Sequence, residues 1–116
     1  MLMEDEFLIA MDIEDELHAR GAQVLGPFSR VRDCLKALEN NQPCAAVLDI
    51  NLADGDVYPI ADRLAQQAKP IVFNTGMNAP AELVQMFASV PVCRKPTSAK
   101  EVVNALEQEM RKLTKS

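Results

Sequence analysis

The chain of 116 residues carries a net charge of −5 at pH 7, with 48% hydrophobic and 25% charged residues. These values are ordinary for one globular domain, and the acidic balance argues against direct binding to nucleic acid or to an anionic membrane surface. No apolar stretch approaches the roughly 20 residues of a membrane span. The cysteines, Cys34, Cys44 and Cys93, lack the spacing of a metal site, which predicts a reduced, cytoplasmic protein.

The first third of the chain alternates between strand and helix patterns. A short strand is predicted at residues 1–3, followed by a helix over residues 7–20 that ends at Gly21. A second strand is predicted over residues 23–27, running into a turn. An apolar stripe over residues 31–38 predicts the second helix, with Ser29 as its N-cap.

The alternation continues to the end of the chain. Residues 45–52 form an apolar run interrupted by Asp49, which is typical of a buried strand that ends at a turn. Further strands are predicted over residues 69–73 and 91–94. Helices are predicted over residues 57–68, with Pro59 near the start, over residues 80–89, and around residues 102–113.

Strands that alternate with helices predict an α/β fold with a parallel sheet covered on both faces. Each connection has room for a right-handed crossover helix. No repeat, linker or low-complexity tract interrupts the pattern, so residues 1–116 are expected to form a single domain without an output domain.

Polar residues follow several of the predicted strands at the point where each ends. Glu4-Asp5 follows the first strand, Asp49 ends the third, and Thr75 and Lys95 follow the fourth and fifth. Ligands of open α/β sheets bind beyond the carboxyl ends of the strands, where these groups would converge. Crowded carboxylates with water suit Mg²⁺, and a lysine and a threonine hydroxyl can contact a phosphoryl oxygen. The set favours phosphoryl transfer to a carboxylate.

With these motifs the chain resembles the receiver domains of two-component response regulators over essentially its whole length. The matching segments are Glu4-Asp5-Glu6, the run from Val47 to Leu52, Phe73-Asn74-Thr75-Gly76 and Arg94-Lys95-Pro96. The chain looks most similar to stand-alone receivers that have a Phe-Ala-Thr-Gly-Tyr type motif after the fourth strand.

The resemblance implies a flavodoxin-like sheet of five parallel strands in the order 2-1-3-4-5. It implies that Asp49 accepts a phosphoryl group from the phosphohistidine of a sensor histidine kinase, that Thr75 follows this group and that Lys95 holds it. The bond between Lys95 and Pro96 would be cis. The protein would be a phosphoacceptor that assists its own Mg²⁺-dependent phosphorylation and dephosphorylation, rather than an enzyme.

The resemblance also implies a cofactor and partners. Asp5, Asp49 and the backbone carbonyl of Asn51 would bind Mg²⁺, with Glu4 contributing through water. The partners would be a sensor kinase of the HWE or a related type and a downstream protein that the sequence does not name. A homodimer is left open.

The chain departs from the common receiver pattern in three places. Val92 stands where receivers commonly carry the tyrosine or phenylalanine that reports phosphorylation, Met77 replaces a tyrosine, and the segment between Thr75 and Lys95 is short. The missing aromatic favours an alternative, a receiver-like adaptor that binds partners without phosphorylation.

Two other classes of protein fit the residues less well. A phosphohydrolase of the haloacid dehalogenase type needs an acid two residues after the nucleophile, where this chain has Asn51. A flavodoxin needs a loop that cradles phosphate after the first strand, where Glu4-Asp5-Glu6 would repel it.

Overall fold

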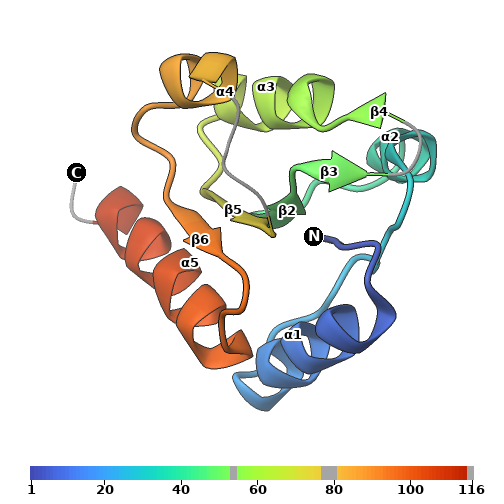
Figure 1. Ribbon diagram of the computed structural model, residues 1–116, viewed down its shortest axis with the longest axis vertical. Helices are drawn as coiled ribbons and strands as arrows, with labels where there is room; N and C mark the ends of the chain where they lie inside the picture. Colours follow the sequence, from blue (N-terminus) through green and yellow to red (C-terminus); the bar gives the residue numbers. More distant parts are fainter. Residues whose placement is uncertain (53–54, 77–80, 115–116) are drawn as a thin grey trace.

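A parallel sheet forms the centre of the computed structural model, which describes residues 1–52, 55–76 and 81–114 (Figure 1). Its strands lie in the order β1-β2-β5-β6, and every neighbouring pair runs parallel. The strands are β1 (Leu2–Met3), β2 (Ala46–Asp49), β5 (Ile71–Thr75) and β6 (Val92–Arg94). The strands predicted at residues 1–3, 69–73 and 91–94 are therefore confirmed, whereas the strand predicted over residues 45–52 joins the sheet only over residues 46–49.

Helices cover both faces of this sheet, as the alternation predicts. Figure 1 shows α1 and α5 on one side and α2, α3 and α4 on the other. The helices are α1 (Phe7–Ala19), α2 (Val31–Leu38), α3 (Tyr58–Gln66), α4 (Ala81–Met86) and α5 (Ala99–Thr114). In the described part of the chain, none of them is long and apolar enough to cross a membrane.

Two separate groups of buried side chains fill the space between the sheet and its helices. On the α1 and α5 side, Val47 and Val72 of the central strands pack with Val102 of α5. On the other side, Phe73 packs with helices α2, α3 and α4, and its ring meets the ring of Phe87 edge-on with centroids 5.7 Å apart. Successive residues of β5 thus point to opposite faces, as a strand requires.

The prediction of a strand over residues 23–27 is wrong for the described residues. The chain does return to the outer side of β1, where the Leu2 N–H donates to the Leu25 carbonyl at 3.0 Å. The Phe28 N–H donates to the Leu2 carbonyl at 2.9 Å, and Met3 and Phe28 form an isolated parallel bridge. The segment therefore occupies the place of an outer strand without forming a ladder.

Gly26 and Pro27 explain why no ladder forms there. Gly26 has φ of +108°, which is outside the strand region, and Pro27 has no N–H to donate. A Cβ atom at Gly26 would lie 2.6 Å from the Leu2 carbonyl oxygen, so the backbones approach too closely for any other residue. Of the predicted strand order 2-1-3-4-5, the sheet therefore contains the first, third, fourth and fifth predicted strands, which are β1, β2, β5 and β6. An irregular segment at the outer edge takes the place of the predicted second strand.

The cap predicted for the second helix is also wrong. Helix α2 begins after Arg30 rather than Ser29, and no side-chain cap bond is made. The Glu4 N–H donates to the Phe28 carbonyl at 2.9 Å, so the docking of this segment on β1 determines where the helix can start.

A short antiparallel pair, β3 (Asn51–Leu52) and β4 (Gly55–Asp56), was not predicted by the apolar pattern.

Helices α1 and α5 are joined by Arg20, which follows the last residue of α1. Its guanidinium donates to Glu16 Oε2 and to Asn104 Oδ1, each at 2.8 Å, and lies 3.3 Å from Glu107 Oε1. Glu16 lies on α1, whereas Asn104 and Glu107 lie on α5. One side chain thus connects two helices that are far apart in the sequence.

Candidate functional site

Three predicted acidic residues come together at the carboxyl edge of the sheet. Asp49 is the last residue of β2, and Glu4 and Asp5 follow β1 directly. One carboxylate oxygen of each lies within 4.8 Å of the others. Glu4 and Asp49 are buried, and Asp5 is exposed. Carboxylates this close repel one another, so the site requires positive charge.

Lys95 supplies a positive charge to this cluster. Its Nζ lies 2.7 Å from Glu4 Oε1 and 3.3 Å from Asp49 Oδ2, and Glu6 Oε1 is 3.6 Å away. Burial lowers the pKa of Lys95, but the hydrogen bond to Glu4 and the charge of Asp49 together outweigh burial, so its pKa lies above the ordinary value. The lysine is therefore charged at neutral pH.

The bond between Lys95 and Pro96 is cis, which confirms the expectation from the receiver pattern. The Lys95 N–H donates to the Thr75 carbonyl at 2.7 Å, which brings the residue after β6 against the end of β5. The Lys95 side chain then crosses this end, because its Cδ lies 3.7 Å from the position of a Cβ atom at Gly76. A larger residue at Gly76 would meet the lysine stem.

Thr75 and Asn51 lie at the same edge. Thr75 is the last residue of β5, and its side chain is fully buried. Asn51 begins β3, two residues after Asp49, and its backbone pairs with Asp56. The structure thus brings Glu4, Asp5, Asp49 and Lys95 into one cluster, with Thr75 beside it, whereas the role of the Asn51 carbonyl stays a prediction.

Two residues of the site were not singled out by the sequence. The sequence gives Glu6 only as part of a motif, yet its carboxylate is a third acidic neighbour of Lys95. The pattern predicts that Asn74 follows the strand, whereas it lies inside β5 and is buried. A signal was present in the sequence, because Asn74 stands where the related motif has alanine.

The departures from the receiver pattern fall near β6. Val92 begins this strand and is 39% exposed, so this position of β6 carries no aromatic side chain. Helix α4 is short, as the spacing between Thr75 and Lys95 predicts. Met77 lies outside the described residues.

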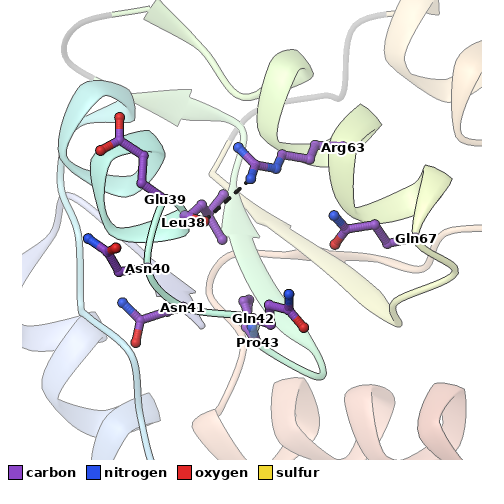
Figure 2. Close-up of a pocket in the computed structure, with 8 residues that line it drawn as sticks. All are labelled: Leu38, Glu39, Asn40, Asn41, Gln42, Pro43, Arg63 and Gln67. Carbon is purple, nitrogen blue, oxygen red and sulfur yellow. Dashed lines mark hydrogen bonds between the residues drawn. The ribbon is translucent and has the colours of Figure 1, made fainter.

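A separate cavity lies at the opposite, amino-terminal edge of the sheet. It has a volume of about 360 Å³, and a guanidinium nitrogen of Arg63 donates across it to the Leu38 carbonyl at 3.3 Å (Figure 2). Figure 2 shows its lining of mostly polar side chains: Leu38, Glu39, Asn40, Asn41, Gln42, Pro43, Arg63 and Gln67. None of the predicted site residues takes part in this cavity.

Solved structures of other proteins share this architecture. SdrG from Sphingomonas melonis is 33% identical, with 94% of this chain matched to 92% of that chain and a TM-score of 0.78. The response regulatory domain of MrkE from Klebsiella pneumoniae is 25% identical, matches over the full length of both chains and has a TM-score of 0.81. The chain belongs to the receiver domains of response regulators.

Further comparisons agree with this family. The signal receiver domain of a diguanylate cyclase from Desulfovibrio desulfuricans is 28% identical to this receiver, matches 96% of it with 91% of its own chain, and has a TM-score of 0.78. The sequence of the MrkE protein is 29% identical over 111 residues, which are 93% of this chain but 41% of MrkE. The chain thus spans less than half of that relative. No family model matches the sequence.

Proposed function

We propose that this receiver accepts a phosphoryl group on Asp49 from the phosphohistidine of a sensor histidine kinase and then signals through contacts with another protein. The observation that supports this most is the buried Asp49 carboxylate, with Lys95 Nζ 3.3 Å from its Oδ2. In the transfer, a carboxylate oxygen forms a bond to phosphorus while the bond between phosphorus and the histidine nitrogen breaks. The positive charge of Lys95 favours the ionised carboxylate that this step needs.

Lys95 and Thr75 have complementary roles in the proposed transfer. The phosphoryl group brings negative charge into a cluster that already holds several carboxylates. Lys95 neutralises part of this charge, and its long stem lets the ammonium move from Glu4 toward the phosphoryl oxygens. The Thr75 hydroxyl, at the end of the neighbouring strand, would donate a hydrogen bond to the same group.

The acidic cluster fits a divalent cation such as Mg²⁺. Its ligands are oxygens, which Mg²⁺ prefers, and Glu4 Oε2 is buried without a hydrogen-bond partner among the described residues. Asp5, Asp49 and the Asn51 carbonyl would hold the ion directly, and Glu4 would act through water. When bound, the ion supplies charge neutralisation for phosphoryl transfer.

The segment from Phe73 to Met77 supports membership of the stand-alone group with the Phe-Ala-Thr-Gly-Tyr type motif. One solved relative is a BeF3-activated conformation of SdrG, and this ion mimics a phosphoryl group. By analogy, residues 1–116 would be activated by a phosphoryl group in the same way, as one cytoplasmic receiver domain. Its partners would be a kinase of the HWE or a related type and a downstream protein. A homodimer with a second copy of the chain is left open.

Intact-mass spectrometry after incubation with acetyl phosphate tests the proposal. The wild type should gain one phosphoryl mass that requires Mg²⁺, and Asp49→Ala should gain none. Asp33→Ala removes an exposed aspartate on α2 and should be labelled like the wild type.

Val92 supports a second candidate, an adaptor that binds its partner without phosphorylation. Its exposed side chain leaves the usual aromatic reporter absent from β6. Failure of the wild type both to gain phosphoryl mass and to bind beryllofluoride would overturn the switch and favour the adaptor.

A further inference from the structure

Asn74 is a buried polar residue that the proposed chemistry does not use. Its side chain is 1% exposed, and its Oδ1 has no hydrogen-bond partner among the described residues. A buried acceptor without a donor is unfavourable, and the related motif has alanine at this place, so the fold itself does not require an amide. We therefore expect a hydrogen-bond donor to reach Asn74 Oδ1 in another state of the site.

The strand register places Asn74 between the phosphoacceptor and the outer strand. Asn74 pairs with Asp49 of β2 on one side and with Cys93 of β6 on the other. Paired residues of neighbouring parallel strands point to the same face of the sheet. For Asn74 this is the face of Val72, which packs against α5.

The stem of Lys95 crosses this face just beyond Asn74. Gly76, two residues later in the chain, has its Cβ position 3.7 Å from Lys95 Cδ. The ammonium at the end of that stem reaches Asp49, the register partner of Asn74. Asn74 thus lies next to the path along which the ammonium crosses the sheet.

In the structure the Lys95 ammonium donates hydrogen bonds to Glu4 and Asp49 and forms a longer ion pair with Glu6. Glu4, Asp49 and Glu6 each place an oxygen within 3.6 Å of Nζ. These carboxylates hold the ammonium beyond the ends of β1 and β2, and no hydrogen bond joins it to Asn74 Oδ1. A phosphoryl group on Asp49 would draw the ammonium away from Glu4 and Glu6 and toward β5.

We propose that Asn74 Oδ1 accepts a hydrogen bond from Lys95 Nζ when a phosphoryl group occupies Asp49, and so positions the ammonium for that group. This inference rests on the proposed function. Asn74 is a positioning residue, because it acts through Lys95. Its neutral carbonyl can orient the ammonium without competing with the phosphoryl oxygens for charge.

Titration with beryllofluoride in the presence of Mg²⁺ tests the inference. Asn74→Ala should weaken beryllofluoride binding about ten-fold or more, as expected for the loss of a hydrogen bond from a charged donor. Affinity for Mg²⁺ alone should stay within about two-fold of the wild type, since the proposed hydrogen bond of Asn74 is to the lysine and not to the ion. Asn74→Ser keeps an acceptor and should recover part of the loss.

Nuclear magnetic resonance gives a second readout that a merely structural role would not move. The ammonium signal of Lys95 should become protected on beryllofluoride binding in the wild type and in Asn74→Ser, but not in Asn74→Ala. Asn104→Ala, which removes an asparagine on α5 outside the site, should behave like the wild type.

Two results would overturn the inference: an Asn74→Ala affinity within about two-fold of the wild type, or an equal loss for Asn74→Ser and Asn74→Ala. A wild type that binds no beryllofluoride would instead contradict the proposed function itself. The two failures are therefore distinguishable.

Discussion

The two outer edges of the sheet are built differently. At the β1 edge, residues 25–28 are held by backbone hydrogen bonds around Gly26, whose φ of +108° prevents a regular strand. At the other edge, β6 is a regular strand paired along its length with β5, and Val92 is exposed. One edge depends on a close backbone approach, whereas the other is held by a regular ladder with β5.

The two edges therefore contribute differently to the site, since one positions the backbone and the other supplies a charged side chain. The β1 edge fixes the backbone that leads to Glu4, because the Glu4 N–H is bonded to Phe28. The β6 edge carries Lys95 across the sheet to the same carboxylates. The site is therefore assembled from a rigid side and from a long, movable side chain.

The largest effect is expected at the β1 edge, for Gly26→Ala. The new Cβ would lie 2.6 Å from the Leu2 carbonyl oxygen at a positive φ, so the free energy of unfolding should fall by more than about 3 kcal/mol. Urea unfolding measures the loss. Gly21→Ala is the matched control, since Gly21 has φ of +85° but nothing within 4 Å, and it should cost only about 1 kcal/mol. Equal losses for the two variants would show that the close approach is unimportant.

A smaller effect is expected for Lys95→Met, which leaves Glu4 and Asp49 without their cation. The free energy of unfolding should fall by about 1–3 kcal/mol at pH 7. Because the folded pKa of Lys95 is raised, its contribution is present in full below the unfolded value of about 10.4 and is lost as pH rises through the folded pKa. Urea unfolding between pH 7 and 11 should show the wild type and the variant converging above that value.

Lys100→Met, which removes an exposed lysine on α5, is the control for Lys95→Met and should change stability by less than about 0.5 kcal/mol. Added Mg²⁺ should raise the Tm of Lys95→Met more than that of the wild type, since the ammonium no longer competes for the carboxylates. A difference between wild type and variant that stays constant up to pH 11 would contradict the assigned role of the lysine charge.

The smallest effect is expected for Val92→Tyr, which introduces the aromatic residue common in other receivers. Because the side chain is exposed on an outer strand, stability should change by less than about 0.5 kcal/mol. Val72→Tyr, in the buried centre, should cost about 1–3 kcal/mol or more through overpacking. A comparable loss at Val92 would show that the β6 edge is as constrained as the interior.

Much of this architecture can be predicted from the sequence because apolar spacing reports which face of an element is buried. The helices and the inner strands follow from that spacing, and Asp49 and Lys95 are located by the strands that precede them. The segment at residues 23–27 has the same apolar spacing as a strand, but Gly26 approaches Leu2 too closely for a ladder. Such an approach depends on a distant part of the chain, so local pattern does not reveal it.

The site could be predicted only in part for a similar reason. Strand ends bring Glu4, Asp49 and Lys95 together, and the structure confirms that they meet. The burial of Asn74 could not be predicted, because asparagine before a glycine-containing turn is ordinary in sequence. Only the length of β5, which continues through Thr75, shows that this amide lies inside the sheet.

Arg20 has a consequence for the way the molecule opens. Its contacts with Glu16, Asn104 and Glu107 tie the end of α1 to the middle of α5, and both helices pack on the same buried group of side chains. We expect amide hydrogens of these two helices to exchange with solvent together, as one cooperative unit, separately from those of α2, α3 and α4. Slow exchange in α5 would then depend on a residue more than eighty positions earlier in the chain.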